Sequence, residues 1–129
     1  MISFQAFRQT DGTPIYLQII RYIQQGLAAG TIRDGDELPS RRVLSALLAV
    51  NPNTVQKAFR LLEDEGLVTS RAGAKSYIQA TPEQIAVLRR VLLETELQTM
   101  VDAARRMGLT REEAHRLLDT LYDKEGTDA

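Results

Sequence analysis

A run of polar side chains between residues 40 and 60 has the chemistry that recognises nucleic-acid bases and phosphates. Asn and Gln can form paired hydrogen bonds with adenine N6 and N7, whereas Lys and Arg can reach guanine or a phosphate oxygen. In a helix, the apolar residues of this segment would face inward and its polar residues outward. The candidates for base contact are Asn53, Gln56, Lys57 and Arg60, with Thr54 at the border of the outward face. They predict a helix face that contacts double-stranded DNA.

Two consecutive arginines, Arg41 and Arg42, stand where a second short helix is expected to begin. A positive side chain at a helix N-terminus opposes the helix dipole and is not stabilised by it. Phosphate binding explains the pair, because helix N-terminal amides and arginine side chains both bind phosphate oxygens. Ser40, the expected cap of this helix, joins them in the predicted contact. An ordinary surface position is the alternative, and it applies to Arg41 more than to Arg42.

A predicted hairpin supplies a further candidate contact. Its turn holds Gly73, which allows close approach of the backbone, and Lys75, which can reach a phosphate or the minor groove. A plain hairpin with a surface lysine is the alternative. Asn51 completes the predicted DNA-contact residues, although capping of the helix that follows is its favoured role.

Charge is uneven along the chain, although the whole chain is almost neutral. The 16 Lys and Arg residues face 17 Asp and Glu residues, so the net charge is −1 and no global cationic field attracts nucleic acid. Residues 38–80 hold six basic and three acidic residues, a net of +3, whereas residues 81–129 hold seven basic and ten acidic residues, a net of −3. The pattern favours a local cationic surface, although a solvated charged face would explain the same asymmetry.

Caps and apolar periodicity mark the helices that must position these residues. A first helix is predicted over residues 14–29, with Thr13 as its cap. A second helix of about ten residues begins after Ser40. A third begins after Asn51, where a proline follows the cap, and ends by Gly66.

Extended segments complete the N-terminal half of the chain. Residues 37–38 are predicted to be extended because a proline follows them. The apolar period changes after the third helix, and residues 67–79 predict a hairpin with a small-residue turn. A winged helix-turn-helix has this order of elements: a helix, a short strand, two close helices and a hairpin. Residues 1–80 are therefore expected to form this domain, with residues 1–12 as an N-terminal arm or short strand.

The C-terminal part, residues 81–125, predicts two amphipathic helices, the second of which begins with a capping box of Thr110 and Glu113. The apolar stripe drifts around the first helix, so a two-helix hairpin cannot cover both faces. We expect this region to form a homodimer interface and residues 126–129 to be a flexible tail. The predicted interface residues are Leu88, Leu92, Leu93, Leu97, Met100, Leu117, Leu118 and Leu121. The fold class expected for the chain is mainly α with a small β-hairpin.

The composition excludes several classes of protein. A chain of 129 residues and 14.4 kDa has room for one small domain with a helical appendage, and a large catalytic fold does not fit. Cysteine is absent and His115 is the only histidine, which disfavours disulfides and metal sites. No phosphate-binding loop or G-x-S-x-G motif is present, so we predict neither an enzyme nor a bound cofactor. No apolar run matches a membrane span or a signal sequence, which predicts a complete cytoplasmic protein.

Several short motifs are spaced along the first 80 residues. They are T-P-I-Y-L-Q-I at 13–19, L-P-S-R-R at 38–42, N-P-N-T-V at 51–55, L-E-D-E-G-L-V at 62–68 and the segment 73–78. Together they resemble the DNA-binding domain of the GntR family of bacterial transcription regulators. The resemblance covers residues 10–80. The N-P-N-T-V motif and a C-terminal region of only two helices resemble the short YtrA subfamily.

The resemblance implies roles for particular residues. It implies that Arg42 is the recurrent DNA-contacting arginine of the family, that Thr54 contacts DNA and that Gly73 is the wing glycine. Pro52 and Gln56 stand where many members carry arginine, so their guanine contacts cannot be transferred to this chain. The family also implies a homodimer that represses transcription from a palindromic operator.

We therefore predict a sequence-specific DNA-binding transcriptional regulator, a homodimeric repressor that binds its operator through the helix starting at Asn51 and the wing at 67–79. Release by a small-molecule effector is a further expectation, although nothing in the sequence names the ligand. The alternative is a winged-helix module that binds a protein instead of DNA. Salt-dependent DNA binding distinguishes the two, because phosphate contacts release counterions.

Overall fold

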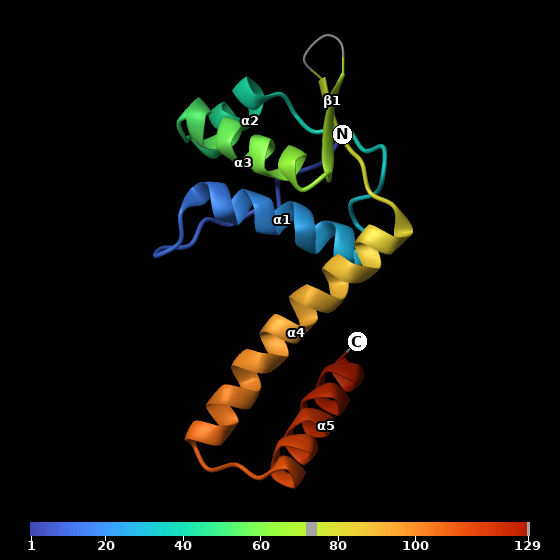
Figure 1. Cartoon of the computed structure of the whole chain (residues 1–129). Helices are drawn as coiled ribbons and strands as arrows, with labels where there is room; N and C mark the ends of the chain where they lie inside the picture. The colour runs from blue at the N-terminus through green and yellow to red at the C-terminus, as the bar shows by residue number, and fades with distance from the viewer. Residues whose placement is uncertain (72–74, 129) are drawn as a thin grey trace. The chain divides into compact units, whose positions relative to one another are not determined.

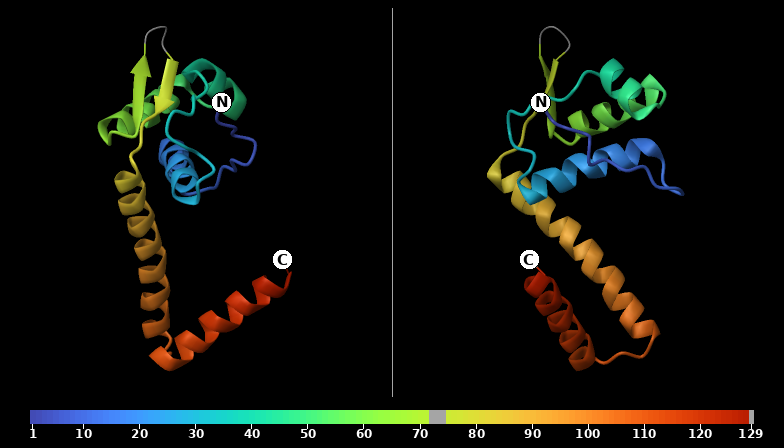
Figure 2. Two further views of the ribbon diagram at one scale, coloured as in Figure 1. Left: turned by 90° about the vertical axis from the view of Figure 1, so that its right-hand side faces the viewer. Right: turned by 180° about the vertical axis from the view of Figure 1, so that it is seen from behind.

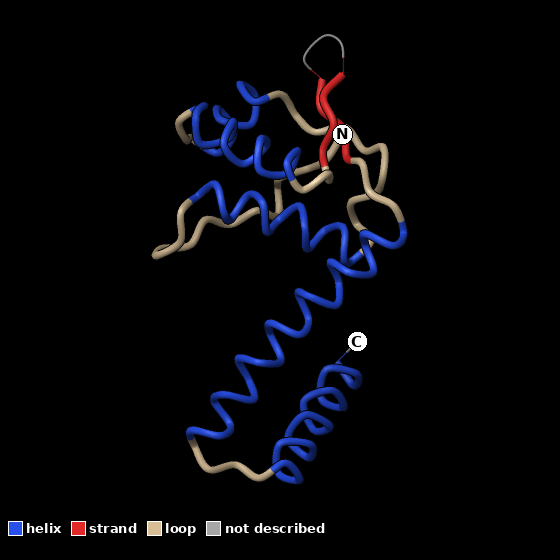
Figure 3. Tube along the Cα trace, viewed as in Figure 1, coloured by secondary structure: helices blue, strands red, loops and turns tan. Residues whose placement is uncertain are grey.

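The computed structural model describes residues 1–71 and 75–128, without the side chains of 125–128. These ranges form five helices and one hairpin, which are drawn in Figure 1. They are α1 (Ile15–Ala29), α2 (Arg41–Leu48), α3 (Pro52–Asp64), β1 (Val68–Arg71), β2 (Lys75–Ile78), α4 (Pro82–Arg106) and α5 (Arg111–Asp128). The chain divides into two compact units, residues 1–90 and 91–129. The predicted fold class, mainly α with a small hairpin, is confirmed (Figure 3).

The helix-turn-helix begins at two side-chain caps. Ser40 Oγ accepts a hydrogen bond of 3.1 Å from the Val43 backbone N–H at the start of α2. Asn51 Oδ1 accepts one of 2.8 Å from the Asn53 N–H at the start of α3. Both caps were predicted from the sequence and both are confirmed. Between the helices, Ala49 turns the chain with φ 56° and ψ 48°, which is the left-handed region.

The first helix starts differently from the prediction. Pro14, and not Thr13, occupies the cap position of α1, and it makes no side-chain capping bond. The Thr13 carbonyl instead accepts a hydrogen bond of 2.7 Å from Gln18 Nε2, and the buried Gln18 amide also exchanges two hydrogen bonds with the Thr10 backbone. Predicting Thr13 as the cap was therefore wrong, because a side chain one turn into α1 satisfies the backbone that leads into the helix.

The hairpin forms one small antiparallel sheet. Val68 pairs with Ile78 and Arg71 pairs with Lys75. A third segment runs along β2, where Leu38 N–H donates to the Ser76 carbonyl at 2.9 Å and Glu37 bridges Tyr77. This confirms the prediction of extended structure at residues 37–38. The hairpin lies beside α3 in both views of Figure 2.

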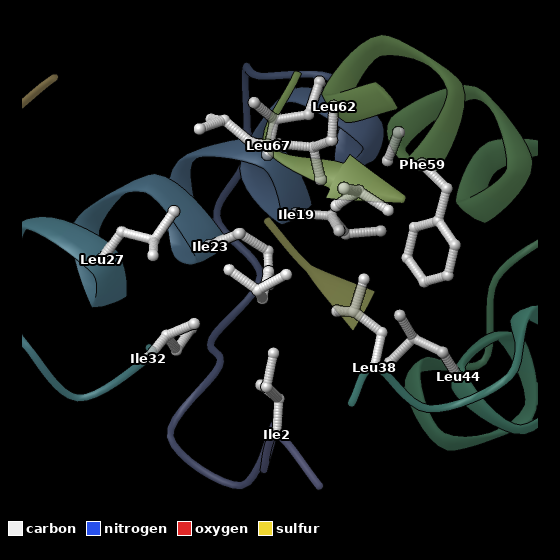
Figure 4. Close-up of a cluster of buried hydrophobic side chains, with 14 of the residues drawn as sticks. Ile2, Ile19, Ile23, Leu27, Ile32, Leu38, Leu44, Phe59, Leu62 and Leu67 are labelled. Atoms are coloured by element: carbon white, nitrogen blue, oxygen red, sulfur yellow. The ribbon is translucent and has the colours of Figure 1, made fainter. Parts of the chain in front are cut away.

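The core of the first unit joins α1, α2, α3 and the sheet. Most of the large, fully buried side chains come from α1 and α3, which pack along each other. Figure 4 shows Ile19 and Ile23 of α1 facing Phe59 and Leu62 of α3, with Leu38 beside them. The apolar face of α3 that the sequence predicted is confirmed: Val55, Ala58, Phe59 and Leu62 are all buried. Because this face is fixed inward, the polar residues between them are fixed outward.

The first residues of the chain are part of this core. Phe4 and Phe7 are buried, and the Phe4 ring stacks on Tyr22 of α1 with centroids 4.9 Å apart. Tyr22 also donates a hydrogen bond of 2.8 Å from its hydroxyl to the Ser3 carbonyl. Residues 1–12, predicted as an arm or short strand, form no strand, and aromatic packing anchors them to α1.

The second unit contains the end of α4 and all of α5. The capping box at the start of α5 is confirmed: Glu113 N–H donates to Thr110 Oγ1, and Thr110 N–H donates to Glu113 Oε1, both at 3.1 Å. Helix α5 includes Gly126, although the sequence placed this residue in a flexible tail. A glycine weakens a helix but does not prevent it from continuing. Among the described residues, no helix combines the length and apolarity that crossing a membrane requires.

Candidate nucleic-acid interface

The exposed face of α3 brings most of the predicted base-contact residues together. Asn53, Gln56 and Arg60 are exposed, and Thr54 is half-buried at the border with the core, as the helical period predicts. No ion pair or hydrogen bond joins the side chains of Asn53, Gln56 or Arg60 to another described residue. These amide and guanidinium groups are therefore available to an external partner.

Lys57 lies at the edge of this face. Its Nζ sits 4.1 Å from the centroid of the Tyr16 ring, near the start of α1. The ring attracts the ammonium group and orients it toward the α1 side of α3. Such a position suits a phosphate at the edge of a groove better than a base edge at its centre.

Cap residues have part of their hydrogen-bonding capacity already in use. Asn51 Oδ1 accepts from the backbone at the start of α3, which leaves its amide NH2 as the free part of the side chain. Ser40 Oγ accepts in the same way at the start of α2. The structure thus gives Asn51 the capping role that the sequence favoured for it.

The two arginines at the start of α2 differ in their surroundings. Arg42 is exposed, and no ion-pair partner for its side chain occurs among the described residues. Arg41 is only half-exposed: its Nη2 lies 3.6 Å from Glu63 Oε1, and its guanidinium lies 5.8 Å from the centroid of the Phe59 ring. Arg42 is therefore free to contact a phosphate, whereas Arg41 has partners within the chain.

The hairpin contributes Lys75, which is exposed, and Arg71, which sequence reasoning did not single out. Arg71 is exposed and its guanidinium lies 4.5 Å from the centroid of the Tyr77 ring on the other strand. Arg71 pairs with Lys75 in the register, so both cations lie on one face of the hairpin. The signal was the alternation of Thr69, Arg71, Lys75 and Tyr77 on that face. Gly73 lies outside the described residues.

The acidic end of α3 is partly neutralised within the chain. Glu63 pairs with Arg41 and also accepts a hydrogen bond from Ser70 Oγ, and Glu65 accepts one of 3.2 Å from Gln24 Nε2 of α1. Glu63 lies in the last turn of the helix, Glu65 is the C-cap residue that follows it, and Asn53 lies in the first turn. The N-terminal part of α3 therefore carries the polar and cationic groups without an acid between them. Among the described residues, no cluster of three or more His, Cys, Asp or Glu side chains could hold a metal ion.

Residues predicted for a dimer interface fall into three groups. Leu93, Leu97, Leu117 and Leu121 are each about half exposed, with relative exposures of 49–53%, and Met100 is 39% exposed. Leu92 and Leu118 are half-buried. Leu88 instead packs against the core of the first unit, because α4 begins on that unit.

Comparison with known proteins gives a consistent answer. A model of the bacterial regulatory proteins of the gntR family matches residues 15–78. The HTH-type transcriptional repressor YtrA of Bacillus subtilis (strain 168) is 34% identical over 106 residues, which are 81% of this chain and 82% of YtrA. A GntR family transcriptional regulator from Listeria monocytogenes has a TM-score of 0.79 and 28% identity over 87% of this chain and 98% of its own. YtrA from Sulfolobus acidocaldarius, a GntR-family transcription factor, has a TM-score of 0.54 and 32% identity over 74% of this chain and 99% of its own. This chain thus belongs to the GntR family of transcriptional regulators, within which it is YtrA-like.

Proposed function

We propose that this protein represses transcription by binding a palindromic DNA operator as a homodimer. The observation that carries the proposal is the exposed face of α3, where the side chains of Asn53, Gln56 and Arg60 have no partner among the described residues, together with the exposed Arg42 at the start of α2. Repression is consistent with the similarity to YtrA of Bacillus subtilis, whose name describes it as a transcriptional repressor. The protein acts by binding, without a reaction of its own, in the cytoplasm where its DNA target lies.

The proposed complex contains two kinds of contact, to phosphates and to bases. Arg42 and Lys75 bind phosphates, and the free N–H groups at the start of α2 bind phosphate oxygens as well. Asn53 and Gln56 read base edges in the major groove, where an amide side chain can bond adenine bidentately. Phosphate contacts set the register of α3, and base contacts select the operator.

The homodimer forms through the second unit. Helices α4 and α5 leave Leu93, Leu97, Leu117 and Leu121 about half exposed in the single chain. A second copy would remove these apolar side chains from water, at about 25 cal/mol for each Å² that is buried. Two copies related by a twofold axis would bind half-sites about one helical turn apart.

A small-molecule effector would bind in the second unit. A cleft of about 410 Å³ lies where α4 and α5 meet. Its lining includes the apolar residues Met100, Ala104 and Leu118 and the cations Arg105 and Arg111. These cations favour an anionic effector. Binding there would release DNA by changing the dimer.

Selection from a random DNA pool, followed by affinity measurement, tests the DNA-binding proposal. Arg42→Ala should weaken binding to the selected operator and to unrelated DNA by the same factor. Gln56→Ala should cost about 1–3 kcal/mol on the operator only. Gln25→Ala, an exposed polar change on α1, is the matched control and should leave both affinities unchanged.

The alternative function, a winged-helix module that binds a protein, predicts a different result. No sequence would then be enriched from the pool, and no salt-dependent DNA complex would form. A uniform loss from Gln56→Ala would leave DNA binding in place but would remove the base-reading role of α3.

A further inference from the structure

One carboxylate connects the elements around the proposed DNA-binding surface. Glu63 Oε1, in the last turn of α3, lies 3.6 Å from Arg41 Nη2 at the start of α2. The same oxygen accepts a hydrogen bond of 3.0 Å from Ser70 Oγ on β1. Glu63 therefore joins both helices of the helix-turn-helix to the first strand of the hairpin.

Arg41 is held from more than one direction. Beneath its guanidinium lies Phe59, which is only 1% exposed, so the arginine covers the core at this point. Its Nε is buried and has no hydrogen-bond partner in the described part of the chain. If Arg41 turned outward to a phosphate, it would lose the Glu63 carboxylate and would uncover the ring. Arg42, its neighbour, loses nothing of this kind.

The second strand of the hairpin, β2, is also attached to the rest of the unit, at the residue that pairs with Ser70. Ser70 pairs with Ser76 in the register, and the Ser76 carbonyl accepts a hydrogen bond of 2.9 Å from Leu38 N–H. Glu63 thus binds β1 at Ser70, and Leu38 binds β2 at the paired residue Ser76. Both attachments lie between the base of the hairpin and Lys75, the residue that the proposed function places on a phosphate.

We propose that Arg41, Glu63 and Ser70 form a brace that sets the hairpin against the helix-turn-helix, and that Arg41 is a positioning residue and not a phosphate contact. The inference rests on the proposed function, because its main readout is DNA affinity. It changes the role of Arg41 from the one that its position beside Arg42 indicates. It also implies that Glu63, at the acidic end of α3, supports DNA binding by holding Arg41 and Ser70 in place.

The sign of the effect of Glu63→Gln distinguishes the brace from simple electrostatics. Removal of a negative charge near DNA strengthens binding if only charge matters. Loss of the brace weakens it, and we expect operator affinity to fall about two- to fivefold, the range for an exposed ion pair. Asp64→Asn is the matched control, because Asp64 is the next residue, is exposed and carries the same charge. It should leave affinity unchanged or slightly raised. Binding of Glu63→Gln as tight as that of Asp64→Asn would overturn the brace.

Salt dependence tests the role of Arg41 directly. Arg42→Gln should reduce the slope of log affinity against log salt by about 0.9, the contribution of one phosphate contact. Arg41→Gln should lower affinity about two- to fivefold and leave this slope unchanged. The double variant of Arg41→Gln with Glu63→Gln should lose less affinity than the two single losses added together, because each change alone already removes the ion pair. A slope reduced as much by Arg41→Gln as by Arg42→Gln would make Arg41 a phosphate contact.

A measurement without DNA separates failure of the brace from failure of the proposed function. Hydrogen exchange of the β1 and β2 amides should be faster in Glu63→Gln and in Ser70→Ala than in the unchanged chain, and Asp64→Asn should not alter it. Thermal unfolding of each variant verifies that it folds. Unaltered exchange in both brace variants would contradict the brace. If the unchanged chain bound no DNA, the proposed function would fail and the exchange result would still decide on the brace.

Discussion

Replacement of Ala49 by glycine should stabilise the protein. Ala49 ends α2 with φ 56° and ψ 48°, and it is the one non-glycine residue with positive φ in the described chain. A side chain in the left-handed region places Cβ against the backbone and costs about 1–2 kcal/mol. Glycine has no Cβ and adopts this conformation at no steric cost.

The magnitude follows from the opposing terms. Relief of the left-handed conformation raises the free energy of unfolding by about 1–2 kcal/mol. The greater freedom of glycine in the unfolded chain lowers it by about 0.4–1 kcal/mol. Ala49 is exposed, so its methyl group gives up no core packing. A net gain of about 1 kcal/mol should raise Tm by about 4–8 °C for a unit of this size.

Thermal unfolding at fixed protein concentration, followed by circular dichroism, measures the shift. Ala46→Gly is the matched control, because Ala46 is an exposed alanine inside α2, where glycine costs about 1 kcal/mol. The two variants should move Tm in opposite directions. Destabilisation of equal size by both would show that Ala49 does not adopt the left-handed conformation.

The other predictions concern a close contact and a titration. Gly26→Ala should destabilise the fold by about 1–3 kcal/mol, although alanine favours helices. The reason is that the new Cβ would lie 2.6 Å from Cγ1 of the buried Ile32. Chemical denaturation measures the change, and a more stable variant would refute the prediction. The pKa of Glu113 should lie below its ordinary value of 4.5, because the Thr110 backbone N–H, and then its side chain, hydrogen-bond to the carboxylate. The capping contribution of Glu113 is then complete above the unfolded-state pKa and is lost as pH falls through the lower folded-state pKa. NMR titration of the Glu113 carboxyl carbon measures this, and a midpoint at or above 4.5 would contradict it.

Local features of the fold could be predicted from the sequence. Ser40, Asn51 and Thr110 cap helices through hydrogen bonds to residues two or three positions away, so the signal and its effect are neighbours in the chain. The inward face of α3 was equally predictable, because a period of 3.6 residues fixes it once Phe59 and Leu62 are buried. The outward position of Gln56 follows from the same period.

Contacts between distant residues could not be predicted. The stacking of Phe4 on Tyr22 depends on the path of the chain between them, and no local pattern encodes it. The same holds for the partner of Arg41, which is 22 positions away in the sequence at Glu63. A pair of adjacent arginines therefore looked like one phosphate-binding unit, although the fold gives its members different surroundings.

The central claim, that the exposed face of α3 lies against DNA bases, can be tested by cleavage from a single position. Because the chain has no cysteine, Gln56→Cys creates one attachment point for an iron-EDTA probe, and Gln25→Cys on α1 provides the control. At saturating protein on the selected operator, we expect the probe at position 56 to cut each half-site within a few base pairs and the probe at position 25 to cut nowhere above background. Equal cutting from both positions, or none from position 56 while the variant remains bound, would contradict the account.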